Sequence, residues 1–180
     1  MTRYVAFLRA VNVGGRTVRM AELAKRLSAL GLRDVSTFIA SGNVGFTAKG
    51  DADALARQIE ADLLAWLGYP VATMVRTRDE LERLVASNPF KGVARAADAK
   101  LYVTFLWEPP KRRPKLPIVS AKEGLQLFRV AGREAFMVAA RLPSGFFGVP
   151  NLAIEKELGV PATTRNWNTI LRMTRPGNPA

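Results

Sequence analysis

The fold is decided by the run Tyr4-Val5-Ala6-Phe7-Leu8-Arg9-Ala10-Val11, which is apolar except for Arg9. Its length and its Val, Phe and Tyr content predict a buried strand. The glycines of Asn12-Val13-Gly14-Gly15 break this strand and predict a loop. Apolar residues then recur at helical spacing between Met20 and Leu30, which indicates an amphipathic helix.

The segments that follow extend this order to six elements. Strands are predicted on either side of Ser41-Gly42-Asn43, a set of residues typical of a hairpin turn. Asp51 is placed to cap a helix that runs to Gly68, and residues 71–77 predict a fourth strand. The order β-α-β-β-α-β is that of a ferredoxin-like unit.

The second half of the chain predicts a similar α+β subdomain. Its expected elements are a helix at 79–86, a strand at 101–107, a hairpin of 125–130 and 135–140, and helices at 152–158 and 166–173. We therefore predict an α+β fold with a ferredoxin-like subdomain over 1–77, a helix and connector over 78–99, and a second subdomain over 100–180. The two halves share an order of elements, and no repeat of individual residues supports a duplication.

The composition excludes several kinds of chemistry. With no Cys and no His, the chain has no disulfide, no thiolate, no imidazole base and no usual zinc ligand. Catalysis would have to rest on carboxylates, Lys, Tyr, a Ser-Lys pair or an oxygen-ligated cation. We expect no cofactor and no metal. Because no apolar run reaches the roughly 18 residues of a membrane span and the first residues enter a strand directly, we expect a cytoplasmic protein.

The charge favours anionic partners. The chain carries 27 Lys and Arg against 15 Asp and Glu, a net charge of +12, and its pI is near 10.9. The first 90 residues hold 12 basic and 9 acidic side chains, whereas the last 90 hold 15 and 6. The Arg-rich and Ala-rich composition is also typical of a GC-rich genome, so two origins of the basic excess stay open.

The basic run Lys111-Arg112-Arg113-Pro114-Lys115 follows two prolines and predicts an exposed loop. Lys111, Arg112, Arg113 and Lys115 are candidate nucleic-acid-binding residues, with Phe105 and Trp107 as nearby groups for base stacking. A solvated loop with no partner is the alternative, because Pro and charged residues are ordinary in loops.

Three polar segments supply a second set of candidates. The Asn12 loop, the Ser41 turn and the segment Thr163 to Thr169, where a helix is expected to begin, combine amides, hydroxyls, glycines and guanidinium groups. Turn and capping chemistry alone is the alternative explanation for each. The candidate ligand-binding residues are Asn12, Gly14, Gly15, Arg16, Ser41, Asn43, Arg165, Asn166 and Asn168.

Four motifs in order resemble the bacterial domain of unknown function 1697 family. They are Tyr4 to Gly15, Met20 to Leu23, Ser41 to Val44, and Ile154 to Gly159 followed by Thr163 to Ile170. The resemblance implies an α+β fold with ferredoxin-like character and carries no activity with it. The chain departs from the family's Tyr-Pro-Asp-Gly type of turn at Arg141 to Gly148, where Leu142 and Ser144 replace the aromatic and the acidic residue.

Three kinds of function remain open. The first is a binder of phosphate-bearing ligands, with nucleic acid favoured by the charge. The second is an enzyme that acts on a small phosphorylated or carboxylated metabolite, with the Asn12 loop as an anion cradle and a carboxylate such as Glu155. The third is a structural or partner-binding protein. We expect the polar loops that carry Asn12, Ser41, Asn43, Arg165 and Asn166 to converge on one site.

Overall fold

The computed structural model describes residues 1–12, 14–15, 17–148 and 151–178. The chain divides into two compact units. Unit 1 contains residues 1–86 and 172–180, and unit 2 contains the continuous stretch 87–171. Each unit has its own antiparallel sheet, so the predicted α+β class is confirmed.

Unit 1 is built as a ferredoxin-like unit. Its elements are β1 (Thr2–Leu8), α1 (Met20–Ala29), β2 (Arg33–Phe38), β3 (Asn43–Ala48), α2 (Ala52–Leu67), β4 (Thr73–Thr77) and α3 (Arg78–Ala86). The four strands are ordered β2-β3-β1-β4, and every described pair of neighbours is antiparallel. This arrangement is the split β-α-β pattern that the order of elements predicts.

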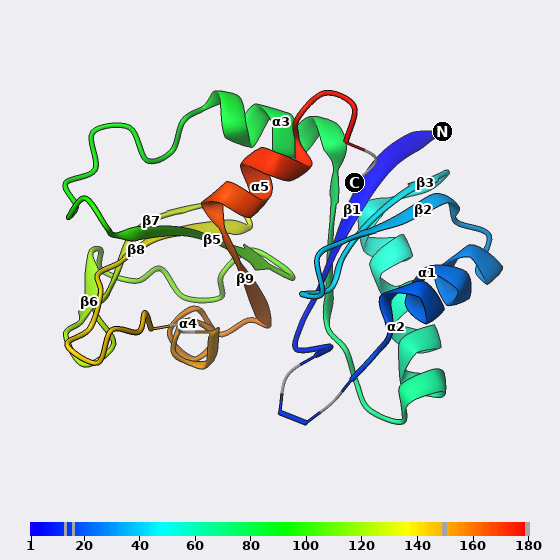
Figure 1. The fold of residues 1–180 in the computed structure, drawn as a ribbon, viewed down its shortest axis with the longest axis horizontal. Coiled ribbons are helices and arrows are strands. Elements are labelled where there is room, and N and C mark those ends of the chain that lie inside the picture. The colour runs from blue at the N-terminus through cyan, green and yellow to red at the C-terminus, as the bar shows by residue number, and fades with distance from the viewer. Residues whose placement is uncertain (13, 16, 149–150, 179–180) are drawn as a thin grey trace. The chain divides into compact units, whose positions relative to one another are not determined.

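The core of unit 1 lies between the sheet and the two helices α1 and α2, which cover the same face (Figure 1). Leu23 and Leu27 of α1 and Ile59 and Leu63 of α2 are fully buried there, at the helical spacing that the sequence shows. Asp51 caps α2, because its carboxylate accepts the backbone N–H of Asp53 at 2.9 Å.

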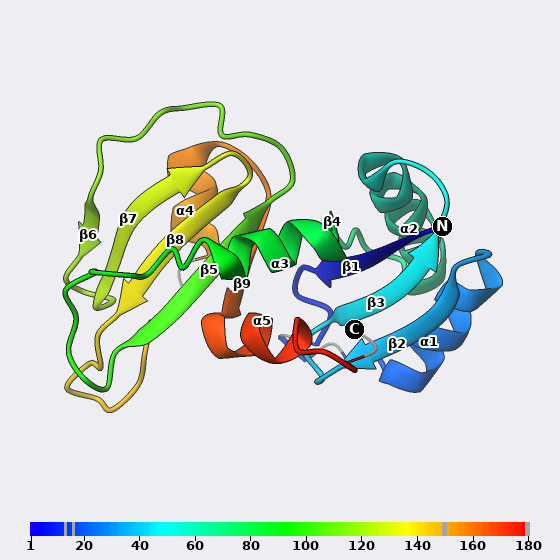
Figure 2. The same ribbon diagram turned by 90° about the horizontal axis from the view of Figure 1, so that it is seen from above.

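Unit 2 contains a five-stranded sheet in the order β6-β7-β8-β5-β9 (Figure 2). Its elements are β5 (Lys100–Leu106), β6 (Ile118–Ser120), β7 (Leu125–Ala131), β8 (Glu134–Ala139), α4 (Asn151–Leu158), β9 (Ala162–Asn166) and α5 (Trp167–Met173). The last two residues of α5 belong to unit 1.

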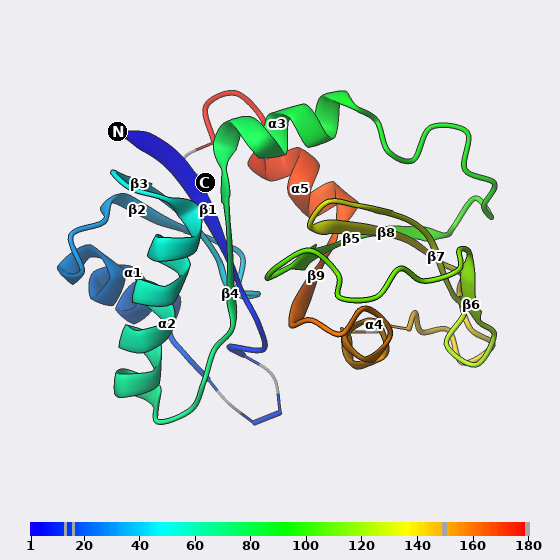
Figure 3. The ribbon, with the colours of Figure 1, turned by 180° about the vertical axis from the view of Figure 1, so that it is seen from behind.

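Both faces of this second sheet are covered within unit 2. Helix α4 lies against one face (Figure 3), where Ile154 and Leu158 pack with the side chains of the strands. On the other face, Phe90 contacts Phe136 and Trp167, with ring centroids 5.9 and 5.2 Å apart. The two faces therefore differ, because α4 packs aliphatic side chains against one of them and aromatic rings gather on the other.

The two sheets share one topology. If β5, β7, β8 and β9 are matched to β1, β2, β3 and β4, the neighbours and their directions are the same in both sheets. The registers also agree, because β1 residue Tyr4 lies opposite Thr77 as β5 residue Tyr102 lies opposite Asn166. Helix α4 then takes the place of α2, and a loop with β6 takes the place of α1.

This match exposes a repeat of individual residues that the sequence analysis did not find. The segments Tyr4-Val5-Ala6-Phe7-Leu8 and Tyr102-Val103-Thr104-Phe105-Leu106 are identical at four of five positions. The helices α2 and α4 end in Leu67-Gly68-Tyr69-Pro70 and Leu158-Gly159-Val160-Pro161. Shared topology, register and residues together indicate an internal duplication.

Two short strands were not predicted. The edge strand β6 has only three residues, too few to show an alternating pattern. The strand β9 occupies Ala162 to Asn166, where no strand was expected, whereas the helix expected over 166–173 is confirmed as α5. Helix α5 begins only at Trp167, because the hydroxyl-rich and polar residues before it form the strand that pairs with β5.

Candidate functional site

The Asn12 loop connects β1 to α1 and is closed at its base by the Asn12 side chain. The Oδ1 atom accepts the backbone N–H of Val18 at 2.6 Å, and Nδ2 donates to the carbonyl of Ala40 at 2.9 Å. Gly14 and Gly15 are exposed beyond this closure and have positive φ angles of 67° and 82°. The tip of the loop is therefore glycine backbone, while Arg16 lies outside the described residues.

The Ser41 turn joins β2 to β3 and lies beside the Asn12 loop. Asn43 is fully buried, and its Nδ2 donates to Ser41 Oγ at 2.8 Å and to the carbonyl of Phe38 at 3.0 Å. The carbonyl of Gly42 accepts the N–H of Leu8 at 2.8 Å. The structure thus brings Asn12, Ser41 and Asn43 together in unit 1, with both asparagine side chains bonded to the protein.

Arg165 lies on β9 of unit 2 and is 7% exposed. Its Nη1 donates to Thr163 Oγ1 at 2.7 Å and to the carbonyl of Thr164 at 2.9 Å. Burial lowers the pKa of the Arg165 guanidinium to about 10, so the group is still a cation at neutral pH. Arg76 stands at the matching position of β4 and donates to the carbonyl of Val75 at 3.0 Å, so this bond is repeated in both units.

Asn166 and Asn168 stand at the start of α5. The Oδ1 atom of Asn166 accepts the backbone N–H of Asn168 at 2.9 Å, which is a helix cap. The Asn168 side chain is exposed. Arg165, Asn166 and Asn168 belong to unit 2 and the Asn12 loop to unit 1, and the convergence of the two groups stays a prediction.

The basic loop, residues 111–115 of unit 2, is exposed as predicted at Lys111, Arg112, Arg113 and Lys115. The backbone N–H of Lys111 donates to the carbonyl of Leu158 at 3.0 Å, which holds the loop at the C-terminal end of α4. Lys111 Nζ lies 3.2 Å from a carboxylate oxygen of Glu108. Among the residues that the structure describes, no acidic side chain pairs with the other three cations.

The two aromatic residues near this loop differ in accessibility. Trp107 is half-buried, whereas Phe105 is fully buried and has no face for a base to stack on. Glu155 is also engaged, since its Oε1 accepts the N–H of Ala162 at 2.8 Å. Glu60 of α2 makes the matching bond to the N–H of Thr73 at 2.8 Å, so this carboxylate holds a helix to its strand in both units.

The structure adds a polar chain that the sequence analysis missed. Thr104 Oγ1 lies 2.8 Å from Thr164 Oγ1, and Thr164 Oγ1 lies 2.5 Å from Asn151 Oδ1. Thr104 is fully buried. The signal that could have found it is the repeat, because Thr104 is the one position at which Tyr102 to Leu106 departs from Tyr4 to Leu8.

A cleft of about 460 Å³ lies in unit 1 beyond the C-terminal end of α1. Leu30, Arg33, Lys49 and Gln58 contribute to its walls, and none of the predicted site residues does. In the described part of the chain, no three acidic, His or Cys residues gather as a metal site. No helix within that part is long and apolar enough to cross a membrane.

Comparisons with known proteins give a family and a fold. The family described as protein of unknown function (DUF1697) matches residues 1–136. A solved structure of a conserved bacterial protein from Streptococcus pneumoniae is similar, with a TM-score of 0.65 and 22% sequence identity, over 96% of this chain and 97% of that one. No curated protein matches the chain.

Proposed function

This chain belongs to the DUF1697 family, and we propose that it binds phosphate-bearing polymers, with nucleic acid as the favoured class. The observation that carries the proposal is the basic loop of unit 2. Arg112, Arg113 and Lys115 are exposed within four residues, and no carboxylate among the described residues neutralises them. Cations of this kind release counterions when they meet a phosphate backbone, which drives binding without regard to sequence.

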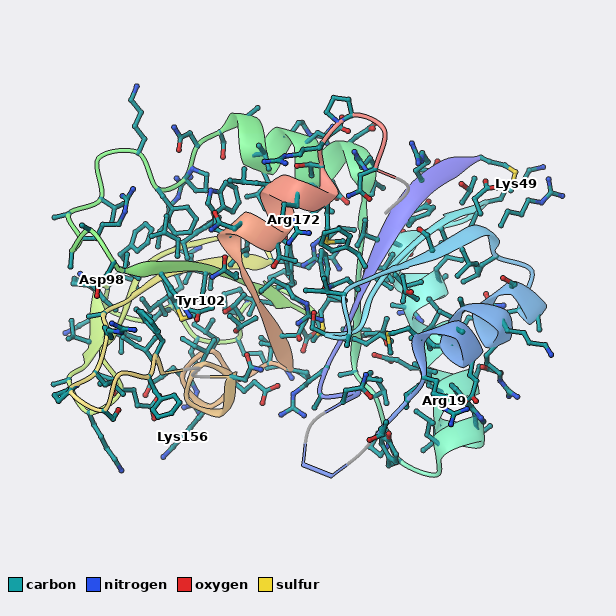
Figure 4. The ribbon with its side chains drawn as sticks, in the orientation of Figure 1. Arg19, Lys49, Asp98, Tyr102, Lys156 and Arg172 are labelled. Carbon is teal, nitrogen blue, oxygen red and sulfur yellow. The ribbon has the colours of Figure 1, made fainter. Side chains whose placement is uncertain are left out.

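The distribution of charge supports the same surface. Unit 2 carries 13 basic and 6 acidic side chains, and Lys156 extends from the adjacent helix α4 away from the strands (Figure 4). Carbonyl groups at the end of α4 add negative potential that favours cations nearby. A nucleic acid would meet these cations along the loop, and the half-buried Trp107, four residues before Lys111, is the candidate for base stacking.

The glycine tip of the Asn12 loop is a second contact in this proposal. Gly14 and Gly15 are exposed, and no described residue other than the chain neighbours of each glycine has an atom within 4 Å of the position that its Cβ would take. Backbone N–H groups can therefore approach a phosphate closely there. The proposal also places the protein in the cytoplasm, which suits a chain without Cys and a polymer such as RNA.

The test is retention on heparin and binding to a generic single-stranded RNA as a function of salt. We expect the variant Lys111→Gln, Arg112→Gln, Arg113→Gln, Lys115→Gln to flatten the plot of log binding constant against log salt by about 2 to 3, at about 0.7 per lost phosphate contact. The control removes four exposed cations of unit 1 as Lys25→Gln, Lys49→Gln, Arg57→Gln, Arg83→Gln.

The control matches the loss of charge, so it separates a local surface from the net charge of the chain. Equal losses in both variants would show that retention follows net charge alone and would contradict the proposal. Unchanged RNA binding in the loop variant would contradict it as well and would favour a small ligand.

A further inference from the structure

The polar chain on the α4 side of the unit 2 sheet has a fixed direction. Thr164 has one hydroxyl proton, and the short contact of 2.5 Å to Asn151 Oδ1 uses it, because that oxygen can only accept. Thr104 must then donate to Thr164 across their contact of 2.8 Å. The carbonyl oxygen of Asn151 is therefore held toward β9, and its Nδ2 group is turned away with two N–H donors.

Asn166 repeats this arrangement two residues along β9 from Thr164. Its Oδ1 is occupied by the N–H of Asn168 at 2.9 Å, so its Nδ2 also offers donors. In the part of the chain that the structure describes, neither Asn151 Nδ2 nor Asn166 Nδ2 has an acceptor. Residues two apart on a strand share a face, so both amides belong to the α4 side.

Tyr102 lies directly opposite Asn166 in the neighbouring strand and faces α4 (Figure 4). The residue is only 9% exposed, and its hydroxyl makes no hydrogen bond to any described residue. This hydroxyl is not among the buried polar atoms of the described residues that lack a hydrogen-bond partner. Burial raises the pKa of the Tyr102 hydroxyl, so the group is a proton donor at neutral pH.

Lys100, the exposed first residue of β5, adds a positive charge next to these donors. It precedes Tyr102 by two residues on β5 and therefore points to the same face. Its ammonium lies 4.1 Å from the ring centroid of Phe147, a cation–π contact that places the charge against the loop before α4. No carboxylate in the described ranges pairs with Lys100.

Unit 1 shows that the fold does not need these groups. Ala6 and Val75 stand at the positions of Thr104 and Thr164, so the matching part of the unit 1 core is apolar. The hydroxyl of Tyr4 donates to the carbonyl of Gly50 at 2.6 Å, whereas that of its counterpart Tyr102 has no such bond. The same sheet is thus built once with a satisfied Tyr and once with a cluster of spare donors.

We propose that Lys100, Tyr102, Asn151 and Asn166 form a site for the phosphoryl group of a small molecule. The four side chains contribute an ammonium, a phenol O–H and two amide N–H groups as donors, and one of these donors is a cation, which favours an oxyanion as the ligand. The site uses none of the side chains of the basic loop, so it stands independently of the proposed binding of nucleic acid.

The test is a calorimetric titration of the whole protein with inorganic phosphate, at constant ionic strength maintained with chloride. We expect Asn166→Asp to weaken phosphate binding at least tenfold, because a carboxylate keeps the cap on Asn168 and replaces the N–H donors with negative charge. Tyr102→Phe removes one hydrogen bond and should weaken binding about three- to tenfold. The control Gln126→Glu adds the same charge on the other face of the same sheet and should bind as the wild type does.

Thermal unfolding of each variant without phosphate reports whether the fold is kept. If Asn166→Asp does not fold, the phosphate affinity of Tyr102→Phe tests the proposed site. The inference is overturned if the wild type does not bind phosphate, or if folded Asn166→Asp and Tyr102→Phe bind it unchanged. It is also overturned if Gln126→Glu loses binding equally. The variant that lacks the four cations of the basic loop should keep its phosphate binding, which separates this site from the proposed nucleic-acid surface.

Discussion

The two sheets solve the same packing problem with different chemistry. Along the central strand of unit 1 the α-covered face presents Tyr4, Ala6 and Leu8, and the matching face of unit 2 presents Tyr102, Thr104 and Leu106. Only the middle residue changes, yet it converts an apolar contact into the start of a hydrogen-bonded chain. Each unit is thus a reference for the other. Side chains that both units share at matching positions serve the fold, and polar side chains that only one unit has need another explanation.

The largest expected effect comes from a position that the units share. Phe7 and Phe105 occupy matching places and are both fully buried. Phe7→Ala and Phe105→Ala should each lower the free energy of unfolding by about 3 to 5 kcal/mol, because each leaves a large cavity. Urea denaturation measures both losses. A loss below about 1 kcal/mol in either unit would show that the two positions are not equivalent in packing.

The second-largest expected effect concerns the buried arginines Arg76 and Arg165, which occupy matching positions in the two units. Arg76→Lys and Arg165→Lys each remove a planar donor that bonds the preceding carbonyl, and each should cost about 1 to 3 kcal/mol of stability. If Arg165 serves architecture alone, the two variants lose similar stability and keep heparin retention. Retention that falls only in Arg165→Lys, with stability held, would give Arg165 the ligand role that its sequence context suggests.

Ala6 of unit 1 and Thr104 of unit 2 occupy matching positions, so each can be replaced by the residue type of the other. Ala6→Thr places a hydroxyl opposite Val75, the unit 1 counterpart of Thr164, which offers no hydrogen-bond partner. This variant should lose about 1 to 3 kcal/mol more free energy of unfolding than the control Ala6→Val, which has the same size. Thr104→Ala should cost about 1 kcal/mol, because Thr164 keeps its bond to Asn151. Chemical denaturation reports these values. Equal stability of Ala6→Thr and Ala6→Val would mean that the unit 1 core tolerates a hydroxyl.

The smallest expected effect concerns the carboxylates that hold each second helix to its strand. Glu60→Gln and Glu155→Gln keep an acceptor oxygen for the N–H of Thr73 and of Ala162, so each should cost under about 1 kcal/mol. Thermal unfolding is the measurement. A much larger loss at Glu155 alone would indicate that this carboxylate has a task beyond the bond that Glu60 shares.

The sequence predicted the regular part of the fold and little of the polar chemistry. Helix α2 was predicted nearly to the residue, since Asp51 and Gly68 mark its ends and its apolar spacing is unbroken. Strand β9 was not, because Thr163 to Asn166 resemble a helix cap in isolation and become a strand only by pairing with β5. The donors at Tyr102 and Asn151 depend on contacts between distant segments, which no local pattern contains.

Among the candidate site residues, too, exposure was predictable from the sequence and the role of a polar side chain was not. Asn12 and Asn43 were chosen for their chemistry, and the structure gives each of them bonds to backbone carbonyls of unit 1. An amide that closes a turn and an amide that meets a ligand look alike in sequence, because both need a polar side chain next to glycine. Exposure of the basic loop, in contrast, followed from its prolines and charges alone.

Arg78 ties the first part of unit 1 to the last residues of the chain, through bonds from its guanidinium to the carbonyls of Arg175 at 3.0 Å and Asn178 at 3.3 Å. Residues 87–171 lie between these two pieces, so unit 2 is in effect an insertion within unit 1. During synthesis from the N-terminus, the sheet of unit 1 emerges first but cannot gain these contacts until all of unit 2 has left the ribosome. The unit that starts first is therefore the last to be completed.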